Sequence, residues 1–169
     1  MCASRRATVE LCSVARSVRL DNDEAWESLG RAHTGILTTL RRDGVPISLP
    51  VWFVALDRRI YVSGPAHTKK FARIRNDPRV GFLVESGLRW IELRGVHLTG
   101  TARFVDDDAR AERVAAALAE KYDGFRIARE EMPDPTRAHY DTSVATIEIT
   151  PDDRILSWEN SRLFEPEPP

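Results

Sequence analysis

The chain has 169 residues, of which 42% are apolar and 30% are charged, and its formal net charge is −1. This length and composition predict one globular domain with a core of its own, and they exclude a disordered or fibrous chain. The near-neutral balance excludes a global electrostatic footprint for nucleic acid or an anionic membrane, so any bound anion needs a local basic cluster.

Residues 1–20 are interpreted as a flexible leader. They contain four arginines among short apolar stretches, and Glu10 interrupts the only candidate for the apolar segment of a signal peptide. The two cysteines, Cys2 and Cys12, are too few for a disulfide framework and lack zinc-ligand spacing. No apolar run approaches the length of a transmembrane helix. We therefore expect a cytoplasmic protein with no membrane partner.

In chain order, the hydrophobic periods predict a helix, three strands, a helix, two strands, a helix and two final strands. The expected ranges are 22–33 (helix), 35–40, 47–56 and 60–63 (strands), 68–76 (helix), 80–84 and 90–105 (strands), 106–118 (helix), and 144–149 and 154–158 (strands). Residues 123–140 are expected to form a loop with a short helical turn.

Local signals mark the ends of the three helices. The run Asp21-Asn22-Asp23, Thr68 and the run Asp106–Asp108 carry candidate side chains for capping helix N-termini. Asp77-Pro78 ends the second helix because proline removes a backbone donor and disfavours helical backbone in the residue before it.

The strands are also bounded by turn residues. Arg42-Asp43-Gly44 predicts a hairpin turn, and Pro46 and Pro50 place the following strand at a sheet edge or make it irregular. Gly95 and Gly100 predict bulges in a strand that must curve. Short antiparallel strands with few helices predict a β-barrel of α+β class, formed by a single domain over residues 21–163, with a disordered tail over 164–169.

The loop and helix start from Ser63 to Lys70 form the most informative segment. Adjacent lysines, a capping hydroxyl and free backbone N–H groups at a helix N-terminus favour a phosphate. The alternative is a solvated helix start whose lysines point into water.

A second candidate segment is Leu49 to Val54. An apolar strand with Pro50 beside Trp52 offers backbone groups and a flat wall to a planar ring system. The alternative is that Trp52 and Phe53 are core or dimer-interface residues.

The order of these pieces resembles the FMN-binding split-barrel family that includes pyridoxamine 5′-phosphate oxidase, in particular its small flavin- and deazaflavin-dependent members. The resemblance covers about residues 25–107, and a weaker similarity covers residues 154–163. Its strongest motif runs from Lys69-Lys70-Phe71-Ala72 to Asn76-Asp77-Pro78-Arg79-Val80 and is similar to the family's Ser-Arg-Lys-Ala and Asn-Pro-Arg-Val segment. It implies a mainly β, α+β fold: a six-to-seven-stranded antiparallel split β-barrel with peripheral helices.

The resemblance also implies a cofactor site. Thr68, Lys69 and Lys70 take the family's phosphate-binding positions, and Val62 and Ser63 match the pair that closes the preceding strand. The strand along the isoalloxazine ring corresponds to Leu49, Pro50, Val51, Trp52, Phe53 and Val54. Family members are homodimers with the cofactor at the subunit interface, so a homodimer is implied here.

The sequence departs from authentic pyridoxamine phosphate oxidases at three positions. Leu49 and Val54 stand where the ring-lining strand has an arginine and a lysine, and Gly95 stands near the family's ring-contacting glutamine. An Arg-Leu-His substrate motif is also missing near the C-terminus. These departures speak against vitamin B6 oxidation while leaving the fold resemblance intact.

The remaining polar residues offer no second site. The four histidines are scattered and fit no metal spacing, and neither a nucleotide-binding glycine motif nor a catalytic triad order is present. The segment from Ser157 to Leu163 resembles the family's closing strand, where Trp158 or Arg162 reaches a partner's cofactor. The alternative is a final strand that seals the barrel with Trp158 in the core.

The leading hypothesis is an oxidoreductase that binds FMN or the deazaflavin coenzyme F420 and exchanges a hydride with a small organic substrate. The alternatives are a non-catalytic cofactor- or tetrapyrrole-binding module on the same barrel, and a purely structural dimer. Both cofactors carry a phosphate, and Arg73 and Arg75 either serve the acidic tail of the deazaflavin or face solvent. Because the ring does the chemistry, the site needs no catalytic triad.

Overall fold

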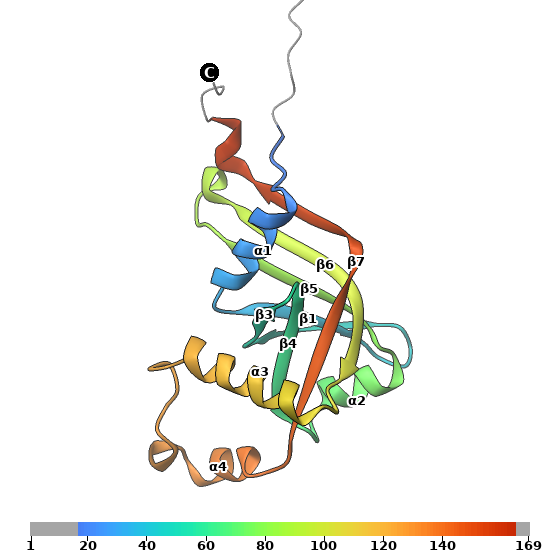
Figure 1. The fold of residues 1–169 in the computed structure, drawn as a ribbon, viewed down its shortest axis with the longest axis vertical. Coiled ribbons are helices and arrows are strands. Elements are labelled where there is room, and N and C mark those ends of the chain that lie inside the picture. Colours follow the sequence, from blue (N-terminus) through green and yellow to red (C-terminus); the bar gives the residue numbers. More distant parts are fainter. Residues whose placement is uncertain (1–16, 165–169) are drawn as a thin grey trace, which may run out of the picture.

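The computed structural model describes residues 17–164 and shows a seven-stranded antiparallel sheet curled into a half-barrel (Figure 1). The strand order is β2-β1-β5-β6-β7-β4-β3. The strands are β1 (Gly35–Leu40), β2 (Pro46–Val51), β3 (Val54–Leu56), β4 (Arg59–Pro65), β5 (Arg79–Ser86), β6 (Arg94–Phe104) and β7 (Val144–Glu159). The expected α+β fold, mainly β, is confirmed.

Helices surround this sheet. They are α1 (Asn22–Arg31), α2 (Lys69–Asn76), α3 (Asp108–Lys121) and α4 (Asp134–Tyr140), with short 3₁₀ turns η1 (Trp90–Glu92), η2 (Arg129–Glu131) and η3 (Asn160–Leu163). In Figure 1, α3 crosses beside β3 and β4, and α2 lies at the lower end of the sheet. No helix in residues 17–164 is long and apolar enough to cross a membrane.

Two apolar clusters hold these layers together. The larger fills the concave face of the sheet and includes Phe53, Phe71 and Phe82, all 0% exposed. The smaller joins α3 to β3 and β4 through residues such as Val54, Tyr61 and Tyr122. Burial of this much aliphatic and aromatic surface is the main force that holds α2 and α3 against the sheet.

Two predicted strands differ from the observed ones. The expected strand over 47–56 is wrong as a single element, because the chain breaks at Trp52 and Phe53 between β2 and β3. The backbone N–H of Phe53 donates instead to the Tyr122 hydroxyl, at 2.8 Å. The strand expected over 90–105 begins only at Arg94, after the η1 turn.

The last two predicted strands form a single strand in the structure. Residues 144–149 and 154–158 belong to β7, whose first half pairs with β4 and which pairs with β6 along most of its length. The register shifts between Leu98 and Gly100 confirm the bulge predicted at Gly100. Gly95, by contrast, pairs regularly with Trp158, and its hydrogen faces the indole: a Cβ there would lie 2.2 Å from the ring.

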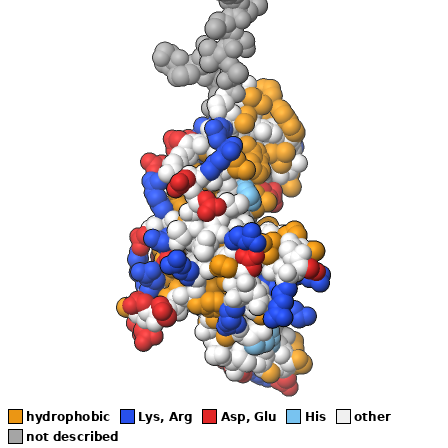
Figure 2. Space-filling view, turned by 90° about the vertical axis from the view of Figure 1, so that its right-hand side faces the viewer, with side chains coloured by type: hydrophobic (Ala, Val, Ile, Leu, Met, Phe, Trp, Pro, Cys, Tyr) orange, Lys and Arg blue, Asp and Glu red, His pale blue; other side chains and the backbone are white. Residues whose placement is uncertain are grey.

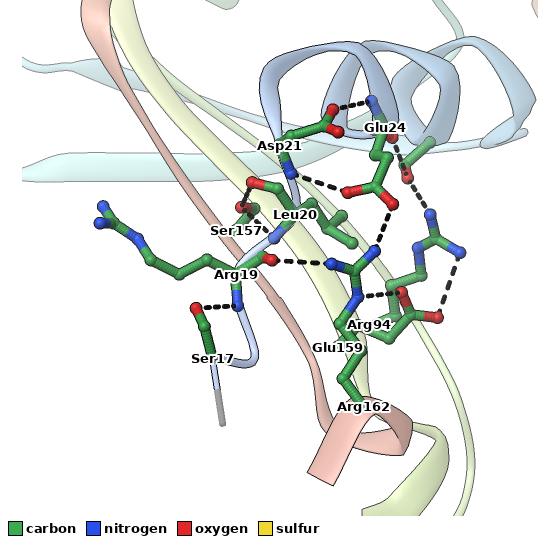
Figure 3. Close-up of polar contacts among 10 residues, drawn as sticks. Ser17, Arg19, Leu20, Asp21, Glu24, Arg94, Ser157, Glu159 and Arg162 are labelled. Atoms are coloured by element: carbon green, nitrogen blue, oxygen red, sulfur yellow. Dashed lines mark hydrogen bonds and ion pairs between the residues drawn. The ribbon is translucent and has the colours of Figure 1, made fainter. Parts of the chain in front are cut away.

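A polar cluster joins the start and end of the described chain (Figure 3). Arg162 pairs with Glu24 and with Glu159, which also pairs with Arg94. Leu20 is buried, and its backbone N–H donates to Ser157 at 3.1 Å. Residues 17–20, assigned above to the leader, therefore lie against β7, whereas 1–16 and 165–169 lie outside the described residues.

Candidate functional site

A cationic cluster forms at the start of α2. Thr68 is the N-cap, as expected, but its side chain makes no capping hydrogen bond and instead accepts one from Lys70 Nζ at 3.3 Å. Burial lowers the pKa of Lys70, and nearby Arg73 lowers this pKa further. A Cβ at Gly64 would lie 3.1 Å from Lys70 Nζ, so glycine there leaves room for the ammonium group.

Arg73, one turn along α2, extends this cluster toward β1 and β2. Its Nε donates to Thr39 Oγ1 at 2.7 Å, and Thr39 in turn donates to the Ile47 carbonyl at 3.4 Å. Its Nη2 is buried and has no hydrogen-bond partner among the described residues.

The cluster is not neutralised by carboxylates. In the described part of the chain, twelve arginines form ion pairs, but Lys69, Lys70 and Arg73 do not. Lys70 and Arg73 repel each other and lack a counter-charge. Such a pair destabilises the fold unless an anion binds between the two cations. This arrangement fits a phosphate.

A strip of apolar side chains leads away from the cluster along β2. In the register of the sheet, Ile47 lies opposite Thr39 and Leu49 opposite Leu37, so this row continues the inner face of β1. Leu49 is nevertheless 39% exposed, and β2 is an edge strand, with β1 as its one described neighbour. From Ile47 to Trp52 the chain spans about 17 Å. The strip therefore suits an elongated ligand with its phosphate at the α2 end.

Aromatic residues close the other end of the strip. Trp52 stacks on Tyr122 with ring centroids 4.3 Å apart and an interplanar angle of 6°, and it is 37% exposed. The Tyr122 hydroxyl lies 2.7 Å from the His33 carbonyl and 3.0 Å from the Phe53 carbonyl. These bonds fix the irregular turn between β2 and β3, so the Trp52 ring is held in one orientation.

One more cation lies at this end. Lys121, the last residue of α3, places Nζ 4.0 Å from the centroid of the Phe53 ring, where the nitrogen is buried and has no hydrogen-bond partner. Burial lowers the pKa of Lys121 to about 8.

The predicted site residues fall into distinct environments. Thr68 and Lys70 lie together, and Lys69 is exposed beside them. Leu49, Pro50 and Trp52 are exposed, and Val51 is partly buried. Phe53, Val54 and Val62 are buried in the apolar clusters, so their side chains pack inside the fold.

Ser63 points away from the cationic cluster. Its hydroxyl bonds Thr146 Oγ1 at 2.8 Å, on the face of β4 that also carries Tyr61. The missing Cβ of Gly64 faces Lys70, and successive residues of a strand face opposite sides. Ser63 and Lys70 are therefore on opposite faces of β4.

Other residues considered above have structural partners. His67 lies 3.3 Å from His139 on α4, which explains a histidine in the loop before α2 without a catalytic role. Arg162 is held by Glu24 and Glu159. Trp158 is half-buried over Gly95. No group of three metal-ligating side chains occurs in residues 17–164.

Sequence reasoning missed His33, Tyr122 and Lys121. His33 packs 4.8 Å from Tyr122 and 4.3 Å from Phe125, between ring centroids. The only sequence signal was the apolar face of α3, whose continuation reaches Tyr122. A groove of about 490 Å³ beside His33, lined by residues such as Ser28, Ile36, Leu83 and Arg94, contains none of the predicted site residues.

Comparison with known proteins gives a family match. Residues 22–153 match the family model described as pyridoxamine 5′-phosphate oxidase. Among solved structures, the conserved hypothetical protein Rv2991 from Mycobacterium tuberculosis is 27% identical, with 90% of this chain and 93% of that chain covered at a TM-score of 0.74. No curated protein sequence matches the chain.

Two further structures are more distant. A FAD-binding protein from Mesorhizobium loti is 18% identical, with 82% of this chain and 91% of that chain covered at a TM-score of 0.61. An F420 reductase is 22% identical, with 77% and 94% covered at a TM-score of 0.57. At these identities the likeness concerns the fold alone. The match over residues 22–153, together with the seven-stranded half-barrel, shows that this chain belongs to the pyridoxamine 5′-phosphate oxidase family.

Proposed function

We propose that the chain is an oxidoreductase that holds FMN or the deazaflavin coenzyme F420 along β2 and exchanges a hydride with a small organic substrate. The observation that carries this proposal is the pair Lys70 and Arg73, two partly buried cations without a carboxylate partner, at the end of an exposed apolar strip. Phosphate oxygens would satisfy both with charge-assisted hydrogen bonds.

The residues have separate roles in this proposal. Lys70, Arg73 and Thr68 hold the phosphate, while Leu49, Val51 and Trp52 offer an apolar surface to the ring. When bound, the cofactor supplies the hydride chemistry, and the protein supplies position and electrostatics. The names of the two distant structures, a FAD-binding protein and an F420 reductase, support a flavin-type cofactor.

The helix arginines bear on the choice of cofactor. Arg73 turns toward Thr39, where it reinforces the phosphate position. Arg75 lies over the Phe104 ring at 4.6 Å, so it leaves α2 in another direction. The pair expected to receive the acidic tail of a deazaflavin is therefore divided, and this favours FMN.

The proposal includes a homodimer in the cytoplasm. Apolar side chains gather at the upper end of the molecule in Figure 2, where η1 and η3 lie. Leu88 is 100% exposed, and exposed Trp90 packs edge-on against exposed Phe164 with ring centroids 6.2 Å apart. Exposed apolar groups of this kind mark interaction surfaces. A sedimentation mass of one chain at micromolar concentration would contradict the dimer.

Fluorescence titration with FMN and with F420 in parallel tests the cofactor. We expect the variant with Lys70→Met and Arg73→Met to bind at least about a hundredfold more weakly, because each of the two lost charge-assisted bonds removes about 1.5–3 kcal/mol. Arg154→Met is the matched control, since Arg154 is an exposed arginine of β7 outside the ion pairs of the described residues.

The outcomes separate the hypotheses. Equal affinity of the double variant and the control would remove the phosphate assignment. Tight binding without reduction by any hydride donor would favour a non-catalytic carrier. Binding of a haem in place of both cofactors would favour the tetrapyrrole-binding module. If FMN, F420 and haem all fail to bind, a structural dimer remains.

A further inference from the structure

Lys121 is oriented in an unusual way for a lysine. Lysine side chains normally lay their methylene stem on apolar surface and keep the ammonium group in water. Here the residue as a whole is only partly buried, yet its Nζ is fully buried and bonds to no oxygen in the described chain. A buried polar group without a partner is rare in folded proteins and calls for an explanation.

The use of lysine in this chain is itself selective. Lysine stands only at positions 69, 70 and 121, although the chain has 25 lysine and arginine residues in total. Arginine stays charged in any protein environment, whereas burial readily shifts the pKa of a lysine. Two of the three lysines belong to the proposed phosphate cluster, and the third lies where the ring-binding segment turns.

The surroundings of Lys121 connect it to that segment. Its Nζ faces the Phe53 ring at 4.0 Å and the Tyr122 ring at 5.7 Å. Tyr122 bonds the backbone N–H of Phe53 and stacks on Trp52. The negative end of the α3 dipole and the two aromatic faces favour the charged form, while burial opposes it.

Other charged or titratable groups near this position are few. His33 packs against Tyr122, and Arg126 lies 5.9 Å from the Trp52 ring. Neither is a carboxylate, and burial alone shifts the pKa of Lys121. A charged Lys121 therefore has no described acidic partner beside the Trp52–Phe53 turn.

We propose that Lys121 makes the ring-binding segment selective for an anionic ring, so that a bound flavin is held more tightly in its reduced, anionic form than in its oxidised, neutral form. This inference rests on the proposed function, because it needs a ring along Leu49–Trp52. Lys121 acts through space and through the turn, without touching the ligand, and is thus a positioning residue.

The test compares the affinities of wild type, Lys121→Met and Lys121→Arg for oxidised FMN and for FMN reduced with dithionite without oxygen. We expect Lys121→Met to bind oxidised FMN as wild type does and to lose about tenfold in affinity for reduced FMN. This tenfold loss equals a fall of about 30 mV in the midpoint potential of a two-electron couple. Lys121→Arg should restore most of the preference because it keeps the charge.

Arg126→Met is the matched control, since it removes an exposed cation near the same Trp52 ring. Its effect should be small because solvent and salt screen exposed charges. Circular dichroism confirms that each variant is folded.

The outcomes distinguish the two proposals. If wild type binds no FMN in either form, the cofactor assignment to FMN fails, and this inference fails with it. If wild type binds FMN but Lys121→Met keeps the same ratio of reduced to oxidised affinity, only the role of Lys121 is overturned. The same holds if Arg126→Met and Lys121→Met lower the ratio equally, because the effect is then one of general charge.

Discussion

Replacing Lys121 by methionine should stabilise the folded protein near neutral pH. Methionine has a similar length and flexibility but no charge, so it fills the same space without an unpaired buried ammonium group. A residue kept for function at some expense of stability is expected to behave in this way. The variant Lys121→Met therefore tests whether the buried amine costs stability.

The magnitude follows from the pKa of the lysine. Burial lowers the pKa of Lys121 from 10.5 to about 8. A difference of about 2.5 in pKa corresponds to about 3 kcal/mol at about 1.4 kcal/mol per tenfold change. Because part of the side chain reaches solvent, we discount this figure to roughly 1–2 kcal/mol for solvent screening.

The direction of the pKa shift of Lys121 sets how stability depends on pH. The pKa in the folded state is lower than in the unfolded state, so the unfolded chain binds more protons between pH 8 and 10.5. Stability therefore rises with pH in this window, and the penalty is fully present only below about pH 8. At pH 9.5 the advantage of Lys121→Met should fall to less than half its value at pH 7.

Urea unfolding of wild type and Lys121→Met at both pH values measures the stability cost of the buried ammonium group. Taking the difference between the two proteins cancels every other titrating group, such as Tyr61, whose pKa is raised to about 12 by burial and the neighbouring Glu148. A stability difference that is the same at pH 7 and pH 9.5 would refute the reasoning, because the cost would then not come from the ammonium charge.

Two further predictions concern the turns around the sheet. Tyr122→Phe should cost about 1–3 kcal/mol in urea unfolding, because it leaves the buried Phe53 N–H without its partner; an equal loss in Tyr140→Phe, at an exposed tyrosine, would contradict this. Joint replacement of Asp57→Asn and Arg58→Gly should raise stability by about 1 kcal/mol, because both residues have positive φ values, 51° and 56°, in the turn between β3 and β4. The replacements also remove exposed ion pairs with Arg113 and Asp23, which contribute little to stability. An unchanged or lower melting temperature would therefore contradict a backbone strain of this size.

Local sequence signals were sufficient for several elements. The helix expected to end at Asn76 after a Thr68 cap is observed as α2, Lys69–Asn76. Asp21 and Asp107, each within a run of predicted cap residues, cap α1 and α3 with their side chains. Each of these features depends on residues within one helical turn of one another, so the sequence determines them directly.

The breaks and continuities of the strands depended on distant residues. The turn at Phe53 is fixed by Tyr122, which is 69 positions away in the chain. The segment Pro151-Asp152-Asp153 looks like a turn locally, yet β7 continues through it because it pairs with β6 on both sides. Strand pairing between distant segments overrides local turn preference at such positions.

The candidate site divides in the same way. Adjacent lysines after a strand and before a helix already predicted an anion site, and composition showed that any anion needed such a local cluster. The sequence thus determined the fold class, the caps of α1 and α3, and the place of adjacent lysines at the start of α2. Only the tertiary structure decided that Arg73 joins Lys70, that Ser63 faces the opposite side, and that Lys121 turns its charge inward. The physical reason is that burial and the absence of a counter-charge depend on which distant elements pack together, whereas caps and turns depend only on neighbours in the chain.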